Sequence, residues 1–464
     1  MKGLKQKEVR FCEKTTELYI LFVTLALSLF CFPYERISEY KFKFFLFGTA
    51  IYIVVLLLGN VELALIGRKS DLVSAFRKAK SIPLVAIFLY FAFCLVSFLL
   101  SEHKAFAIMG GGKFDGIVPL VLYVLAFASV AIFGKVNKSF FLGLGIVVWV
   151  NFIIVLLQVF GANPIFLYPQ GLNYYDAFKL YANEFLGTFG NVDILSVFFA
   201  MALPIFICSA MNFGGKTKYF FFSAITLSSF LLLICKVYTG LLGAGVAIFI
   251  MGATLKEEEK IRVFLCSLFW CSFGVLFALL LTKLISFGAF VLGFVISFVF
   301  ILAKKMPIKR FSRFFVAFSI LFGLIIGYII IKDSDADSGR LKIWRDAFNM
   351  FLEKPLFGIG TGAYFKESST IFERFDPSLG ITIKSAVDCA HNVYLNILVN
   401  SGIFALLSYI WLMISIFLYS KNRQFIFPAL AYLICALFSF EICSVSAFFY
   451  VICGLAVSDN INKL

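Results

Sequence analysis

Charged residues are scarce in this sequence: they make up 14% of its 464 residues, against roughly 25% in an ordinary soluble domain. Hydrophobic residues make up 62% of the chain and include 62 phenylalanines. A chain with so few charges cannot cover a folded surface with polar groups. The composition therefore excludes a soluble globular protein and indicates that lipid surrounds most of the chain.

The sequence also lacks the patterns that mark disulfide-rich, metal-binding or nucleic-acid-binding proteins. Its 11 cysteines contain no Cys-x-x-Cys pair and lie mostly inside apolar runs, where a cysteine packs as a small hydrophobic residue. The net charge is +15, but the lysines and arginines lie between the apolar runs and form no single basic face. We predict no metal, no cofactor and no nucleic-acid partner.

Long apolar runs, in contrast, fill the sequence. A helix needs roughly 20 apolar residues to cross a bilayer. The runs predict an all-α polytopic membrane protein with about 14 transmembrane helices, in a range of about 12 to 14. They lie at 17–33, 44–66, 82–100, 116–133, 139–160, 192–211, 219–235, 238–254, 263–282, 285–303, 314–331, 392–420, 425–440 and 442–457. The runs that meet at Lys236 and at Glu441 could each form one kinked helix instead.

The positions of the basic residues predict the orientation of the chain. With the N-terminus in the cytoplasm, 25 of the 41 lysines and arginines fall on the cytoplasmic side and 8 fall in short outer loops, as the positive-inside rule requires. The other 8 lie in the long segment 332–390, which the rule exempts because long loops cross the membrane regardless of charge. We predict eleven transmembrane helices in 1–331, an extracytoplasmic loop at 332–390, three helices in 391–464 and both termini in the cytoplasm.

The long outer loop contains one amphipathic helix. Between Gly339 and Glu353, apolar residues recur every three or four positions, and Pro355 follows the helix end. The recurring residues are Leu341, Trp344, Phe348 and Phe351. A helix that is apolar on one face at the water boundary should lie along the membrane or on top of the bundle.

Polar residues at the ends of the predicted spans gather on the outer side. This placement favours chemistry at the outer face over a proton-coupled or ion-coupled carrier, which usually has such groups near the bilayer midplane. The residues are Lys113, Asp115, Asn191, Asp193, Lys236, Arg340, Asp388, His391 and Glu441.

His391 is the main candidate for a catalytic group. It is one of only 2 histidines, and an imidazole can exchange a proton near neutral pH. Asp388, three residues earlier, could orient the ring. The alternative is that His391 and Asn392 only cap the start of the next helix. His103, in a short polar loop, is interpreted as a solvated loop residue.

Three cations are candidates for binding an anionic group on the outer side. Arg340 opens the amphipathic helix, and a guanidinium at a helix N-terminus suits a phosphate or pyrophosphate; otherwise it is an interfacial anchor. Lys236 and Lys113 would add positive charge there, or be ordinary loop lysines that reach for water. The Gly358-x-Gly360-x-Gly362 run lacks the strand and the Gly-Lys-Ser/Thr sequence of a nucleotide-binding loop, so we interpret it as a flexible turn.

Several of these segments, in order, resemble the signature region of the O-antigen ligase and polymerase superfamily. They are Ser338-Gly339-Arg340 with Trp344, Pro355 to Gly362, Ala390-His391-Asn392-Val393-Tyr394-Leu395, and Ser401-Gly402. The segments 187–191 and 110–116 resemble weaker motifs of the same family. The combination covers about 335–410, and with the weaker motifs the resemblance extends through most of the chain.

The resemblance implies a metal-independent, inverting membrane glycosyltransferase. It implies an undecaprenyl-pyrophosphate-linked glycan as donor, a saccharide as acceptor, and a site on the outer face of the cytoplasmic (inner) membrane. His391 matches the histidine that activates the acceptor hydroxyl, and Arg340 matches an arginine that holds the donor pyrophosphate. The candidate substrate-binding residues are Lys236, Lys113, Asn191, Asn392, Trp344 and Asp388.

One departure from the family pattern concerns pyrophosphate binding. Many members carry Ser-Arg near the start of the span that begins here at Thr239-Gly240, and this sequence has no arginine there. Lys236 could replace that charge but lacks the bidentate fork of arginine. Two functions follow as hypotheses: a surface polysaccharide polymerase or ligase and, as the alternative, a lipid-linked oligosaccharide flippase, which should show related halves and midplane charge.

Overall fold

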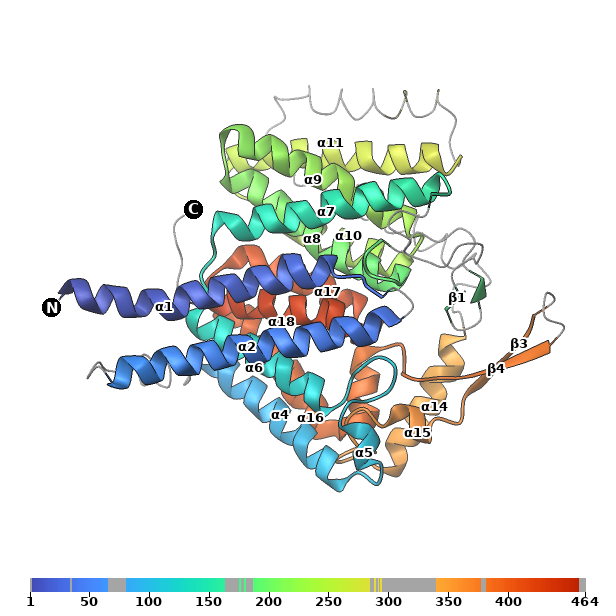
Figure 1. Cartoon of the computed structure of the whole chain (residues 1–464). Helices are drawn as coiled ribbons and strands as arrows, with labels where there is room; N and C mark the ends of the chain where they lie inside the picture. Colours follow the sequence, from blue (N-terminus) through green and yellow to red (C-terminus); the bar gives the residue numbers. More distant parts are fainter. Residues whose placement is uncertain are drawn as a thin grey trace.

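The computed structural model describes most of the chain as a bundle of apolar helices (Figure 1). The described residues are 2–33, 36–65, 81–162, 175–176, 179–180, 187–283, 288, 291, 293, 339–376 and 381–458. The predicted span 314–331, and all but three residues of 285–303, lie outside this part of the chain.

Among the described residues, seven helices are long and apolar enough to cross a membrane. They are α2 (Ile37–Leu65), α4 (Ile82–Leu100), α7 (Lys138–Val159), α8 (Val192–Asn212), α9 (Gly215–Ile234), α11 (Glu258–Leu281) and α16 (Val393–Tyr419). Shorter apolar helices are α6 (Ile117–Phe133), α10 (Tyr238–Thr254), α17 (Ile426–Cys435) and α18 (Cys443–Val457). The helical, polytopic membrane architecture is therefore confirmed, whereas the count of about 14 spans stays a prediction.

The predicted first span corresponds to α1 (Lys2–Leu21), which continues into a π-helix at Phe22–Leu27. At Lys236, the turn that was ambiguous in the sequence separates two helices, α9 and α10, and the backbone of Lys236 is left-handed (φ 54°). At Glu441, the connection 436–442 likewise separates α17 from α18. Both hairpins therefore consist of two helices rather than one kinked helix.

Two helices form the interior of the bundle. Every residue of α18 but the last is buried, and so is α8 from Ile194 to Ala210. Helix α8 packs against α9, α10 and α17, and α18 packs against α6. A helix buried all round has to be apolar all round, which explains why these two runs show no polar face.

The described residues of the segment 332–390, called the outer loop after its predicted location, form structure of their own at one end of the bundle. They contain α14 (Arg340–Glu353), α15 (Tyr364–Glu367) and the antiparallel strands β3 (Ile371–Asp376) and β4 (Ile381–Ala386). Figure 1 shows the β3–β4 hairpin pointing away from the helices, at the end of the bundle opposite to the start of α1. The sequence predicted neither this hairpin nor the shorter one formed by β1 (Tyr175–Asp176) and β2 (Lys179–Leu180).

Helix α14 confirms the predicted amphipathic helix but packs through a different face. Its buried stripe is Ile343, Ala347 and Met350, whereas Leu341 is 62% exposed and Phe348 is 50% exposed. The helix packs against α16. The exposed apolar side chains therefore remain available to lipid or to an apolar ligand.

The glycine run is not the flexible turn that the sequence suggested. Helix α16 is broken at Gly402 (φ 77°, ψ −178°), and the run lies against this break. The N–H of Ile359 donates a hydrogen bond to the Val399 carbonyl (3.1 Å), and the N–H of Gly360 donates one to the Asn400 carbonyl (2.9 Å). A Cβ added at Gly358 would lie 2.5 Å from the Asn400 backbone. Gly358 is therefore needed because the two backbones approach too closely there for any side chain.

Candidate active site

His391 stands at a helix end of the bundle, in the turn that leads into α16. Its backbone is left-handed (φ 48°), a conformation that costs a non-glycine residue roughly 1 to 3 kcal/mol. The neighbouring backbone holds the turn: Val393 N–H donates to the Ala436 carbonyl (2.8 Å) and Ala390 N–H to Asn396 Oδ1 (3.2 Å). The packing of α16 against the α17–α18 connection thus fixes where the imidazole points.

The helix-cap alternative is correct for one of the two residues. Asn392 is the N-cap of α16, and its Oδ1 accepts a hydrogen bond from Leu395 N–H (3.0 Å). His391 precedes the cap and makes no capping bond in the described structure. Its strained backbone therefore needs another explanation than helix initiation.

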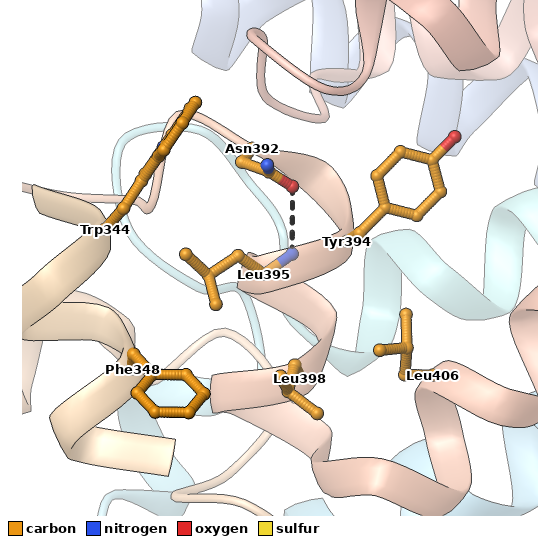
Figure 2. Close-up of a pocket in the computed structure, with 7 residues that line it drawn as sticks. All are labelled: Trp344, Phe348, Asn392, Tyr394, Leu395, Leu398 and Leu406. Atoms are coloured by element: carbon orange, nitrogen blue, oxygen red, sulfur yellow. Dashed lines mark hydrogen bonds between the residues drawn. The ribbon is translucent and has the colours of Figure 1, made fainter. Parts of the chain in front are cut away.

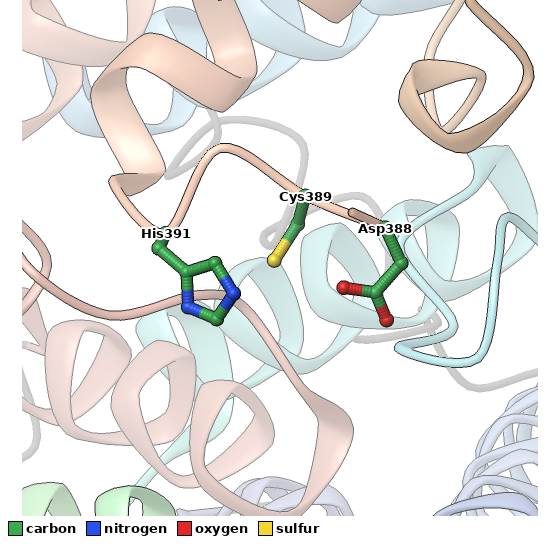
Figure 3. Close-up of side chains that lie close together, drawn as sticks. All are labelled: Asp388, Cys389 and His391. Atoms are coloured by element: carbon green, nitrogen blue, oxygen red, sulfur yellow. The ribbon is translucent and has the colours of Figure 1, made fainter. Parts of the chain in front are cut away.

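Three polar side chains, those of Asp388, Cys389 and Lys113, gather around the His391 ring. A carboxylate oxygen of Asp388, the sulfur of Cys389 and a ring nitrogen of His391 all lie within 4.8 Å of one another. Figure 3 shows the three side chains directed toward the same space. Lys113 Nζ lies 3.5 Å from Asp388 Oδ2 and 4.2 Å from the centre of the Phe440 ring, which His391 also contacts edge-on (5.5 Å between centroids). The structure thus brings Lys113, from the loop before α6, to the predicted base.

The surroundings keep the imidazole neutral. Burial lowers the pKa of His391 to about 4, with Lys113 and Arg340 also lowering it and Asp388 opposing them. A neutral ring at pH 7 has a free nitrogen lone pair and can accept a proton. Arg340, at the start of α14, is close enough to His391 to act on it electrostatically. Arg340 and His391, 51 positions apart in the sequence, therefore lie on the same side of the folded chain and within electrostatic range of each other.

Two further carboxyl groups adjoin the cluster, and the sequence identified them only as polar residues at span ends. Burial raises the pKa of Asp115 to about 6. The hydrogen bond from the Asn396 amide (3.4 Å) lowers this pKa, and the charge of Asp388 raises it. Burial, together with Asp115, raises the pKa of Glu441 to about 7. In the described structure, Glu441 Oε1 is buried and has no hydrogen-bond partner. Only tertiary packing brings these groups together, because they come from separate parts of the chain.

An apolar groove of about 380 Å³ lies beside this cluster (Figure 2). It runs between α14 and α16: Trp344 and Phe348 come from α14, and Leu395 and Leu398 face them from α16. Asn392, next to His391 in the chain, is the one polar residue that lines it. The groove therefore offers an apolar ligand a place within one residue of the candidate base.

Of the remaining predicted residues, two have no contact with the cluster recorded among the described residues. Asn191 caps α8, since its Oδ1 accepts from Asp193 N–H (2.8 Å) and Ile194 N–H (3.2 Å). Lys236 is exposed in the α9–α10 turn and makes no hydrogen bond or ion pair with the His391 cluster in the described structure. His103, predicted to be a solvated loop residue, instead pairs with Glu367 (2.9 Å).

The buried Glu441 carboxyl gives a stability prediction with a defined sign. With an ordinary pKa of 4.5 and a folded-state pKa of about 7, the folded state keeps a proton that the unfolded state loses, so stability falls as pH rises from 4.5 to 7. Glu441→Gln imitates the protonated form and should escape this loss, which amounts to at most about 3 kcal/mol.

The measurement is thermal unfolding of the purified protein in detergent. The Gln variant should melt above the parent at pH 8, and the difference should shrink at pH 5. Glu353→Gln, a change at an exposed carboxyl at the end of α14, is the matched control. A Glu441→Gln variant that melts below the parent at pH 8 would contradict the prediction.

Comparison with known proteins finds a family match. Residues 222–410 match the family described as O-antigen ligase, a region that begins in α9, crosses the outer loop and ends in α16. The match includes Lys236, Arg340, Trp344, Asp388, His391 and Asn392, while Lys113 and Asn191 precede it. No curated protein matches the chain.

Proposed function

We propose that this multi-pass membrane protein transfers a lipid-linked glycan onto an acceptor saccharide. The proposal is supported by the family match, which points to the O-antigen ligase and polymerase superfamily. The match supports glycan transfer of this general type. The finer proposal is that the donor is an undecaprenyl-pyrophosphate-linked oligosaccharide or polysaccharide and that transfer takes place at the outer face of the cytoplasmic membrane. The observation that carries it is the placement of the His391 imidazole beside Asp388 and Lys113, in a turn that adjoins an apolar groove.

The proposed reaction needs a base for the acceptor. The acceptor hydroxyl oxygen attacks the anomeric carbon of the donor, the bond from that carbon to the pyrophosphate oxygen breaks, and the hydroxyl proton passes to His391. Attack from the face opposite to the leaving group inverts the configuration. The imidazolium that forms is stabilised by Asp388, whose carboxylate lies within 4.8 Å of a ring nitrogen.

The leaving pyrophosphate needs positive charge. Lys113 lies beside the base, 3.5 Å from Asp388, and Arg340 also acts on His391 electrostatically, so these two cations are the ones we propose for the phosphate groups. Arg340 can form two parallel hydrogen bonds to phosphate oxygens, and Lys113 contributes a point charge. Charge that develops on the leaving group in the transition state is then stabilised by groups already in place. In this proposal, the reaction uses no metal or cofactor.

The donor lipid accounts for the groove. A polyprenyl chain is apolar, and Trp344, Phe348 and Leu398 line a surface that it would cover. Burial of apolar area contributes about 25 cal/mol per Å². With the chain in the groove, the pyrophosphate at its end would face Arg340 and Lys113. Asn191 and Lys236 remain predicted substrate-binding residues to which this arrangement assigns no contact.

The test is purified protein in liposomes, supplied with donor and acceptor from the face that carries the β3–β4 hairpin. We expect a glycosidic product and release of the lipid pyrophosphate. The alternative, a flippase, is disfavoured because the polar cluster lies at one end of the bundle, whereas a carrier usually holds its substrate near the midplane. Movement of donor across the bilayer without any product would favour the flippase and refute the enzyme.

The proposed orientation gives its own prediction. In intact cells, a membrane-impermeant thiol reagent should label a cysteine at Glu353→Cys, on the exposed end of α14. It should label a cysteine at Lys256→Cys, in the exposed turn between α10 and α11, only after lysis. Both variants are made in a chain whose native cysteines are replaced, and the reverse labelling pattern would invert the topology.

A further inference from the structure

Cys389 is a buried thiol between two residues of the proposed site, and the proposed reaction does not use it. Its side chain is 1% exposed, and in Figure 3 its sulfur points toward the space that Asp388 and His391 also face. In the described part of the chain, these residues form the one group of three metal-ligating side chains. A carboxylate oxygen, a sulfur and an imidazole nitrogen together are typical ligands of a borderline-soft cation.

We propose that Asp388, Cys389 and His391 bind one thiophilic divalent cation of the Zn²⁺ class, and that this cation inhibits glycan transfer. The binding part rests on the geometry of the three side chains. The inhibition part rests on the proposed function of His391, because a ring nitrogen that coordinates a metal has no lone pair left for the acceptor proton.

The distances suit a metal after a small adjustment. The ligand atoms lie within 4.8 Å of one another, whereas two ligands of a tetrahedral zinc ion, with bonds of about 2.3 Å to sulfur and about 2.1 Å to nitrogen or oxygen, lie about 3.4 to 3.6 Å apart. Side-chain rotations that move the ligand atoms by about 1 Å close this gap. Asp388 and Cys389 precede the turn that holds His391, so their side chains can rotate toward the imidazole without moving the helices.

The charges decide which metal binds. Lys113, 3.5 Å from Asp388, and Arg340 oppose any cation at this position. Binding displaces the Cys389 thiol proton to solvent, so a thiolate and a carboxylate together offset the charge of the metal. Mg²⁺ and Ca²⁺ prefer oxygen ligands and gain little from sulfur. The site should therefore select Zn²⁺ and exclude Mg²⁺.

Metal binding is measured first, without reference to activity. Purified full-length protein in detergent, stripped with a chelator, is titrated with Zn²⁺ against a fluorescent zinc indicator. We expect one tight site, an increase in melting temperature with Zn²⁺, and no competition by Mg²⁺. Cys389→Ser and Cys389→Ala should weaken binding by about tenfold or more, whereas Cys266→Ser, at a partly exposed cysteine of α11, should leave it unchanged.

Transfer activity is measured second. Zn²⁺ should inhibit the parent and the Cys266→Ser variant, and Cys389→Ser should transfer normally without metal and resist Zn²⁺. Zinc affinity that is unchanged in both Cys389 variants would overturn the site. Tight binding without inhibition would overturn the inhibitory role. If the parent has no transferase activity at all, the proposed function fails, while the titration still tests the metal site.

Discussion

His391→Ala should lower turnover by about 10² to 10⁴-fold while leaving the affinity for donor nearly unchanged. The reason is that a general base acts in the transition state, whereas the donor is held by the groove and the cations. Steady-state kinetics with purified protein in liposomes separate the two effects, since kcat should fall and KM for the donor should stay. The acid limb of the parent's pH profile should lie near pH 4 rather than 6.5, because burial lowers the pKa of His391 to about 4.

The second histidine provides the matched control. His103 pairs with Glu367 at the edge of the outer loop and has no proposed role in transfer, so His103→Ala should keep near-normal turnover. Both variants must first match the parent in expression and melting temperature. Near-normal turnover in His391→Ala would remove the base from the mechanism and leave His391 as part of the turn that Asn392 caps.

Arg340→Ala should weaken donor binding and lower turnover together. A cation that faces pyrophosphate stabilises the bound donor and also the charge on the leaving group. Removing it should reduce kcat/KM by about 10² to 10³-fold, the scale of losing one charge-stabilising donor. Arg340→Lys should restore only part of the loss, because the charge returns without the bidentate fork.

A second arginine on the same helix controls for loss of positive charge. Arg345 is exposed on α14 and lies one and a half turns from Arg340, so Arg345→Ala should leave the kinetics close to those of the parent. Equal losses in the two variants would mean that α14 acts through its overall charge. In that case, the interfacial-anchor interpretation of Arg340 would be the better one.

The sequence was sufficient for features that depend on local pattern. Apolar runs of span length predicted the helices, and the three- and four-residue spacing predicted α14 to within one residue of its start at Arg340. The motifs around Arg340 and His391 led to the family that the comparison over 222–410 supports. Each of these signals lies within one continuous segment, so no knowledge of packing was needed.

Features that depend on contacts between distant segments could not be predicted. Lys113 reaches Asp388, and Asp115 lies near Glu441, only because the ends of four separate elements meet. The glycine run was wrongly interpreted as flexible because its partners, the carbonyls of Val399 and Asn400, lie about forty residues later. Asn191 belongs to a family-like motif, yet in the structure its side chain caps α8.

The contact between the glycine run and the break in α16 limits how this protein can be recombined with others. The run bonds to the carbonyls of Val399 and Asn400, and Ile403 N–H donates back to the Pro355 carbonyl (3.0 Å), while the same half-helix carries His391 at its other end. A Cβ at Gly402 would lie 2.2 Å from the Leu356 carbonyl oxygen. A chimera that exchanges outer loops must therefore take residues 355–362 and 391–403 from the same parent, because each is shaped to the backbone of the other.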